Sequence, residues 1–185
     1  MDAIEAIHAR RSIRDYEPRG VARGVVEAVL WDAAQAPSTP VSGERPWAFN
    51  VIEGAERIAE YGARAKAYAR EHKPAGAGYA WADREDFSVF FNAPVVVVIS
   101  GRSENSQAVQ ECCRAGQTLM ISATARGLGT CWVGSPLLWM SDPAVRAELS
   151  VPEGFEPYAV FTLGYPRTTP DGKPRGRPEI IWSGV

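Results

Sequence analysis

The chain has 185 residues and a formal net charge of −2 at pH 7, with 45% hydrophobic and 23% charged residues. This composition is typical of a globular protein and excludes a disordered or fibrous chain, and the length predicts a single domain over residues 1–185. Because the net charge is slightly negative, no overall positive field attracts nucleic acid or an anionic membrane, and we expect neither as a partner.

Membrane insertion, secretion and metal binding have equally little support. The longest strongly apolar run, residues 93–99, is far shorter than the ~20 residues that cross a membrane. Acidic residues interrupt the N-terminus where a secretory signal is first basic and then apolar, so we expect a cytoplasmic protein. Three cysteines, two of them adjacent, and two histidines match neither a disulfide framework nor a metal site.

Helices dominate the predicted elements. Asp2 and Glu5 form a capping box for a first helix that ends near Arg10, with Ile4 and Ile7 on its apolar side. Few strands separated by long helices predict an α+β domain. In chain order, the further expected elements are a helix over residues 25–36, a loop over 38–46, a strand over 47–52, a helix over 55–72, an exposed connection over 73–79, a buried strand over 93–99, a helix over 107–126, a strand over 130–133, a short helix from Asp142 and a strand over 158–163.

The common nucleotide-binding and hydrolase motifs are missing from the sequence. Residues 127–130, Gly-Leu-Gly-Thr, follow a predicted helix instead of opening one, so they are not the glycine fingerprint of a doubly wound dinucleotide fold. There is no phosphate loop ending in Gly-Lys-Ser/Thr and no Gly-x-Ser-x-Gly elbow. We therefore assign no side chain as a catalytic nucleophile, acid or base.

An arginine cluster at the end of the first helix is the strongest candidate for ligand binding. Arg10, Arg11, Ser12 and Arg14 offer three guanidinium forks and a hydroxyl suited to a phosphate, and Ile13 ties the segment to the core. Each charge-assisted hydrogen bond contributes roughly 1.5–3 kcal/mol, whereas association costs about 4–15 kcal/mol. The ligand must therefore bury a planar apolar body as well as an anionic group.

A glycine-rich stretch over residues 127–134 offers a surface for such a body. Its backbone can let a ring system lie close, because glycine carries no side chain. The alternative interpretation, a helix stop at Gly127 followed by a core strand, fits the local pattern equally well.

Five short motifs follow one another along nearly the whole chain. They are Arg10-Arg11-Ser12-Ile13-Arg14, Ala36-Pro37-Ser38 with Pro46-Trp47, Gly-Leu-Gly-Thr-Cys-Trp-Val-Gly over residues 127–134, Leu163-Gly164-Tyr165-Pro166, and Lys173-Pro174-Arg175. In this order and at this chain length, the sequence resembles the nitroreductase family of FMN-dependent oxidoreductases. The resemblance implies a nitroreductase-like three-layer α+β fold, with a central, mainly antiparallel sheet flanked by helices. It also implies an intertwined homodimer with FMN at the interface and an exchanged C-terminal strand, which residues 180–182 would supply.

The resemblance assigns cofactor contacts residue by residue. By similarity, Arg10, Arg11 and Ser12 hold the phosphate and the ribityl chain, joined from the tail by Arg175 or Arg177. Arg14 lies nearer the pyrimidine side of the ring, the backbone of residues 131–134 faces the isoalloxazine, and Ser38 arrives from the other subunit. The residues expected to bind the cofactor are Arg10, Arg11, Ser12, Arg14, Pro37, Ser38, Arg45, Cys131, Trp132, Val133, Gly134, Lys173, Arg175 and Arg177.

The second motif departs from the family pattern. That pattern reads Ser-x-x-Asn-x-Gln-Pro-Trp, whereas residues 38–47 form a longer segment that contains neither Asn nor Gln. Arg45 either replaces the glutamine contact or forms a solvated pair with Glu44. Four aromatic residues lie in or beside the variable region where family members shape acceptor access: Tyr61, Tyr68, Tyr79 and Trp81. Exposed aromatic residues are, however, common on helices.

The implied activity is hydride transfer from NADH or NADPH through the flavin N5 to a nitroaromatic, quinone or similar small planar acceptor, in a ping-pong sequence. In such an enzyme the cofactor carries the redox chemistry and the protein supplies orientation and electrostatics. One alternative is a flavin-binding storage or sensor protein with little turnover, because the altered loop could close the acceptor site. Another is a reductive dehalogenase-type reaction on the same scaffold.

Overall fold

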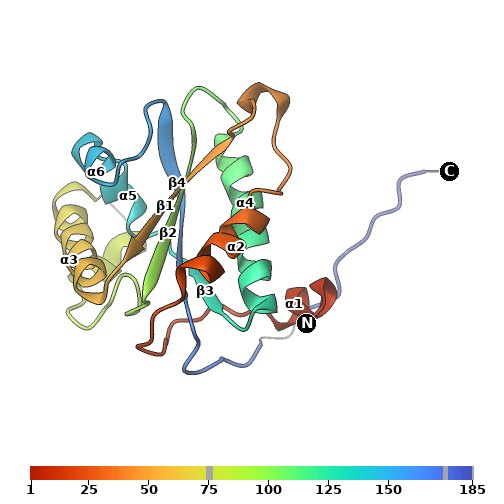
Figure 1. Cartoon of the computed structure of the whole chain (residues 1–185), viewed down its shortest axis with the longest axis horizontal. Helices are drawn as coiled ribbons and strands as arrows, with labels where there is room; N and C mark the ends of the chain where they lie inside the picture. Colours follow the sequence, from red (N-terminus) through yellow and green to blue (C-terminus); the bar gives the residue numbers. More distant parts are fainter. Residues whose placement is uncertain (74–76, 173–174, 185) are drawn as a thin grey trace.

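The computed structural model describes residues 1–73, 77–172 and 175–184 (Figure 1). The elements in chain order are α1 (Ala3–Ala9), α2 (Arg23–Ala33), the 3-10 helix η1 (Pro40–Ser42), β1 (Trp47–Glu53), α3 (Ala55–His72), the 3-10 helix η2 (Ala77–Asp83), β2 (Val95–Arg102), α4 (Ala108–Ala125), β3 (Gly129–Trp132), α5 (Leu137–Met140), α6 (Pro143–Glu148) and β4 (Phe155–Gly164).

One sheet organises the molecule. Its strand order is β1-β2-β4-β3, and all neighbouring strands are antiparallel. The valine run of β2 is fully buried, with Val96, Val97 and Val98 at 0% exposure. A central strand covered on both faces needs apolar side chains at every position, which is why this run does not alternate with polar residues.

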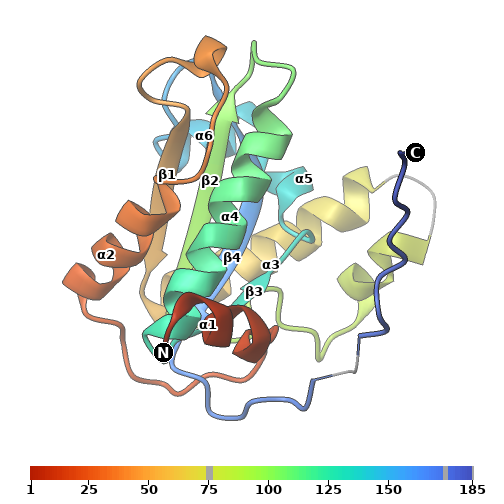
Figure 2. The same ribbon diagram turned by 90° about the vertical axis from the view of Figure 1, so that its right-hand side faces the viewer.

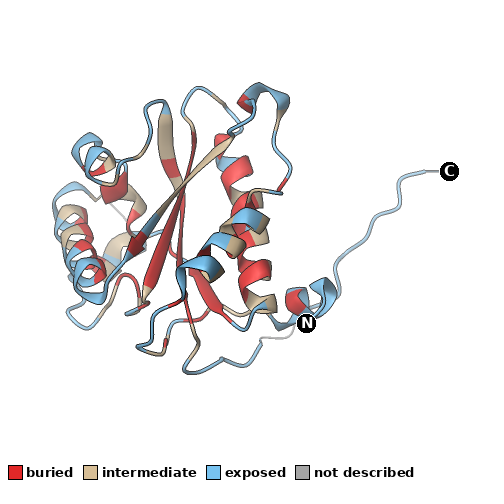
Figure 3. Ribbon diagram, viewed as in Figure 1, coloured by how far each residue is buried: buried red, intermediate tan, exposed pale blue. Residues whose placement is uncertain are grey.

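Helices cover both faces of the sheet and make three layers. In Figure 1, α2 and α4 lie on one side, and α3, α5 and α6 lie on the other. Successive strand side chains point to opposite faces, so Val95 and Val97 pack in the core with α2 and α4, whereas Val96 and Val98 pack in the core with α3 and α5. Figure 3 shows the buried residues concentrated in the sheet and on α4. The expected α+β class and helix-flanked antiparallel sheet are confirmed.

The first helix differs from expectation in what it buries. The capping box between Asp2 and Glu5 is present. Only Ala6 of this helix is buried, whereas Ile4 and Ile7 are 64% and 50% exposed. The apolar side predicted from Ile4 and Ile7 therefore faces away from the core of its own protomer.

Several other elements differ in extent or were not expected. Residues 77–83 form η2 where an exposed connection was expected over 73–79, and residues 74–76 lie outside the described part. β4 begins at Phe155, ahead of the expected residue 158. The short helix α5 was not expected, and it buries Trp139 and Met140 in the core beside α3. Within the described ranges, no helix is both long and apolar enough to cross a membrane.

Candidate functional site

The N-terminal arginine segment lies beside β3. Ser12 bridges Thr130 in parallel, and the Ile13 amide donates to the Thr130 carbonyl at 2.9 Å. Ile13 is 3% exposed. A Cβ built on Gly129 would lie 2.8 Å from the Ile13 Cβ, so only glycine allows this approach. Two segments that are far apart in the sequence thus share one edge of the sheet.

Tyr16 hydrogen-bonds the same segment to the sheet. Its hydroxyl donates to the Ile13 carbonyl at 2.8 Å and lies 2.7 Å from the Thr162 hydroxyl oxygen. Burial is the main cause that raises the pKa of Tyr16 well above the usual range of a phenol. The phenol is therefore neutral at physiological pH. It donates to Ile13 within the segment, and its contact with the Thr162 hydroxyl joins the segment to β4.

A large, positively lined cavity opens at this segment, which we call the arginine cavity. Its volume is about 840 Å³, within the range of small-molecule sites. Its lining comes from both ends of the chain: Ile7, His8, Arg10, Arg11, Ser12, Arg14, Pro170, Asp171, Gly172 and Arg175. Four arginines against one aspartate make the cavity suited to an anion.

Arg11 is held in place on two sides. Its Nη1 donates to the carbonyl oxygens of His8 at 2.7 Å and Arg10 at 2.9 Å, at the C-terminal end of α1. A Cβ built on Gly172 would lie 2.7 Å from the Arg11 Cζ, so the tail packs directly on the guanidinium. The guanidinium therefore caps α1 and at the same time forms part of the cavity wall.

A second cavity adjoins the first through Arg14, and we call it the aromatic cavity. Its volume is about 580 Å³, and its lining is Arg14, Gly78, Tyr79, Trp81, Phe87, Phe91, Cys131, Trp132, Val133, Gly134 and Ser135. Ring centroids are 6.3 Å apart for Tyr79 and Trp81, 5.8 Å for Trp81 and Phe87, and 5.9 Å for Phe87 and Phe91. The Arg14 guanidinium lies 5.7 Å from the Phe91 ring centre. A row of aromatic rings thus faces the glycine-rich stretch.

Burial alternates along this stretch. Cys131 and Val133 are buried, whereas Trp132 and Gly134 are exposed. Burial raises the pKa of the Cys131 thiol, and the nearby charges of Arg14 and Arg10 oppose that shift. A buried, protonated thiol is a poor nucleophile.

Within the part of the chain that the structure describes, no group of three or more His, Cys, Asp or Glu side chains is placed to hold a metal ion.

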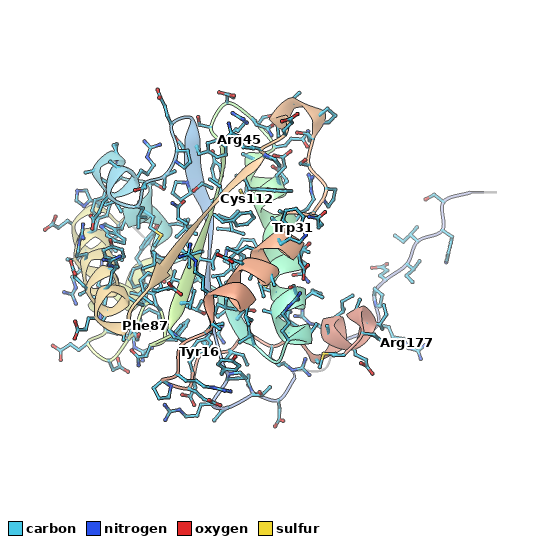
Figure 4. All side chains as sticks on the ribbon, in the orientation of Figure 1. Tyr16, Trp31, Arg45, Phe87, Cys112 and Arg177 are labelled. Atoms are coloured by element: carbon cyan, nitrogen blue, oxygen red, sulfur yellow. The ribbon has the colours of Figure 1, made fainter. Side chains whose placement is uncertain are left out.

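The structure places the second-motif residues at the other end of the sheet. Their loop precedes Trp47, which pairs with Gly101 of β2, and Gly101 in turn pairs with Glu156 of β4. On the arginine side, Thr130 pairs with Leu163 of β4. Glu156 and Leu163 are seven residues apart along β4, or roughly 23 Å. In Figure 4, Arg45 lies at the end opposite Tyr16 and Phe87. Pro37, Ser38 and Arg45 are exposed there, remote from both cavities of their own protomer.

The three expected tail cations have different positions. Arg175 lines the arginine cavity. Arg177 is exposed and does not line either cavity. Lys173 lies outside the described residues. Sequence reasoning missed Phe87 and Phe91, because the fold and not the chain order brings them opposite residues 131–134.

The geometry fits one kind of ligand. An anionic group matches the arginine cavity, and a planar body matches the aromatic cavity, with Arg14 between them.

Comparison with known proteins agrees with this geometry. Residues 7–165 match the profile of the Nitroreductase family. A protein of Methanothermobacter thermautotrophicus named NADH dehydrogenase/NAD(P)H nitroreductase is 31% identical over 185 residues, covering 98% of this chain and 86% of that protein. The 4-nitrobenzoate reductase of a Nocardioides strain is 28% identical over 207 residues, covering 89% of this chain and 82% of the relative. The crystal structure of a Bacteroides fragilis nitroreductase with bound FMN matches with a TM-score of 0.86 at 26% identity, covering 100% of both chains.

Proposed function

The chain belongs to the nitroreductase family, and from that premise we propose that it is an FMN-dependent NAD(P)H oxidoreductase that reduces nitroaromatic, quinone or similar small planar acceptors. The observation that carries this proposal is the junction of the two cavities at Arg14. One cavity supplies positive charge, and the other supplies aromatic walls and an exposed glycine-rich edge.

The residues present fit FMN. Arg10, Arg11 and Arg175, with Ser12, would hold the phosphate, because their donors line one cavity. Arg14 would add a positive charge beside the ring, at the point where the two cavities meet. Residues 131–134 would present their backbone to the ring. When bound, FMN would supply the hydride-transfer chemistry between NADH or NADPH and the second substrate.

The aromatic row supports a planar acceptor. Phe87 and Phe91 meet edge to face, at an interplanar angle of 82°. Such a wall can stack a flat ring and exclude water from it. Orientation and exclusion of water are the tasks we assign to these side chains, and no acid or base is required of them.

We propose that the active form is a homodimer. Arg45 lies at the end of the sheet opposite Tyr16 and Phe87, and Ser38 belongs to the same loop, so a second copy would have to bring them to a flavin. Large apolar side chains are also exposed on the protomer, among them Trp31 at 72% and Trp182 at 88%. Burying such groups favours association. Because the cytoplasm supplies NADH and NADPH, it is the compartment that we propose.

The test uses the purified full-length protein. We expect a yellow protein whose released chromophore is FMN, and oxidation of NADH or NADPH that accelerates when a nitroaromatic or quinone is added under anaerobic conditions. Bound flavin without an acceptor-dependent rate would favour the storage or sensor alternative. A colourless protein that takes up no FMN would refute the proposal.

A further inference from the structure

Glu111 on α4 is a fully buried carboxylate that the proposed reaction does not use. Its exposure is 0%. Burial by itself raises its pKa, but hydrogen bonds from Thr39 and Ser42, with the charge of Arg114, lower the pKa of Glu111 below its usual value. The group is therefore an anion at neutral pH. A buried charge is tolerated only when hydrogen bonds or opposite charges compensate for lost water.

Within the described ranges, the direct partners of this carboxylate come from two loops. Oε1 accepts from the Thr39 amide and the Thr39 hydroxyl, each at 2.6 Å. The Ser42 hydroxyl lies 2.9 Å from Oε1 and 2.7 Å from Oε2. The Asn105 Nδ2 donates to Oε2 at 3.1 Å and lies 2.7 Å from the Ser42 hydroxyl oxygen. Among the described residues, Glu111 has no salt bridge, so neutral donors alone solvate it directly.

Two arginines hold the backbone of the same loop, residues 37–46. Arg114 Nη1 donates to the Pro37 carbonyl at 2.8 Å, and Arg102 Nε donates to the Ser42 carbonyl at 3.1 Å. The loop is thus attached to α4 and β2 through its inward side. Thr39 and Ser42 form that side, whereas Ser38 and Arg45 are exposed on the outward side.

We propose that Glu111 is a positioning residue that fixes the 37–46 loop so that Ser38 and Arg45 are presented to the flavin of a second protomer. This inference rests on the proposed function and on the proposed dimer. It accounts for the departure of this loop from the family pattern, because the hydroxyls of Thr39 and Ser42 are directed to Glu111 and not to a ligand.

A carboxylate suits this task better than an amide. Both oxygens accept hydrogen bonds here, whereas glutamine offers one acceptor oxygen and an NH₂ group that faces donors. Charge-assisted hydrogen bonds are also stronger than neutral ones. An ordered loop binds with less entropy loss than a mobile one, so the hydrogen bonds of Glu111 to the 37–46 loop favour cofactor affinity.

The direct test compares Glu111→Gln with the matched control Glu56→Gln, an exposed glutamate on α3. Hydrogen–deuterium exchange of the FMN-free full-length protein is followed in a peptide spanning residues 37–47 and in one from β2. We expect exchange of the loop peptide to rise about tenfold in Glu111→Gln, the size of losing one charge-assisted bond, with β2 unchanged. Equal loop exchange in both variants would show that Glu111 does not fix the 37–46 loop. Ser42→Ala, a smaller change, must show the same direction if Glu111→Gln folds poorly.

The second measurement tests whether fixing the 37–46 loop strengthens FMN binding. We expect the FMN dissociation constant to rise several-fold in Glu111→Gln. Ser38→Ala should weaken binding in the wild-type background and have no further effect in Glu111→Gln, because the two residues act through one loop. Unchanged FMN affinity with raised loop exchange, or fully additive effects, would overturn the positioning role. Failure of the wild-type protein to bind FMN would instead refute the proposed function and, with it, the role toward the flavin.

Discussion

The arginines of the site differ in how many structural contacts each makes with the rest of the protein. Arg11 caps α1 and packs on Gly172, so replacing it would disturb the helix end as well as the cavity. Arg14 lies over Phe91 and connects the two cavities. Arg175 enters the arginine cavity from the exposed tail. It is therefore the residue at which anion binding can be tested with least effect on folding.

Arg175→Ala should weaken FMN binding, whereas Arg177→Ala should not. Loss of a charge-assisted contact to the phosphate corresponds to about one to two orders of magnitude in the dissociation constant. Arg177 is the matched control because it lies two residues away and does not line the cavity. Flavin fluorescence titration measures both constants. Equal affinities would remove Arg175 from the phosphate site.

The ion pair between Arg64 and Glu148 gives a pH prediction independent of the cofactor. Two guanidinium nitrogens reach the carboxylate at 2.8 and 2.6 Å. The hydrogen bond from Arg64 lowers the pKa of Glu148 to about 2. Since the native pKa lies below the unfolded value of about 4.3, the stabilisation is present above pH 4.3 and is lost as the pH falls toward 2. Both side chains are more than one third exposed, so screening limits it to less than about 1 kcal/mol.

We therefore expect Glu148→Gln to be less stable than wild type at pH 7, with a difference that shrinks as the pH falls from 4.3 toward 2. Urea unfolding at pH 7, 5, 3.5 and 2.5 gives the difference in unfolding free energy. A difference that stays constant over this range would contradict the assignment.

Helix α4 packs closely against the sheet at Gly116. Gly116 lies against the ring of Phe161, and a Cβ there would lie 2.7 Å from Phe161 Cε2. Phe161 is fully buried between β2 and β3, so its ring has little freedom to move. The glycine is thus required for this helix to reach its position on the sheet.

Gly116→Ala and Gly24→Ala should change stability in opposite directions. At Gly116 the added methyl overpacks the core, which costs about 1–3 kcal/mol. At Gly24 on α2, apart from its chain neighbours and the local helix backbone, no atom of the described residues lies within 4 Å of the new Cβ. Alanine should therefore stabilise the helix by about 0.4–1 kcal/mol. Urea unfolding of both variants provides the comparison. Equal effects would show that the helix position tolerates the extra methyl group.

At the scale of the whole molecule, the C-terminal tail carries apolar side chains without cover from its own protomer. Ile180, Ile181 and Trp182 are 64%, 79% and 88% exposed. Figure 1 shows this segment running away from the three layers, and Figure 2 shows it from the side on which it projects toward the viewer. Such a segment is costly in water unless another surface covers it, and the proposed second protomer would provide that surface.

Truncation after Arg177 should abolish the dimer, whereas truncation after Ser183 should not, because only the first removes the three apolar residues. Sedimentation velocity of the two variants and the wild type is the measurement. We expect a monomer or an aggregate for the shorter chain. An unchanged dimer peak would contradict the exchanged tail.

Local patterns in the amino-acid sequence predicted most of the helices and strands and an anionic group on the ligand. The predicted bounds of α3 agree with the structure to the residue, and the buried valine strand was recognised from its continuous apolar run. Both features arise from periodicity and burial over neighbouring residues. The guanidinium groups of Arg10, Arg11 and Arg14 likewise predict an anionic ligand wherever the fold places them. The four-residue α5 was missed because it is too short to show a period.

Which distant residues meet became clear from the folded structure. It placed Arg175 and not Arg177 in the cavity, moved the 37–46 loop to the far end of the sheet, and set Phe87 and Phe91 opposite residues 131–134. It also buried Glu111 beneath the loop. These outcomes depend on strand register and helix packing, which are properties of the whole core and not of any local stretch of sequence.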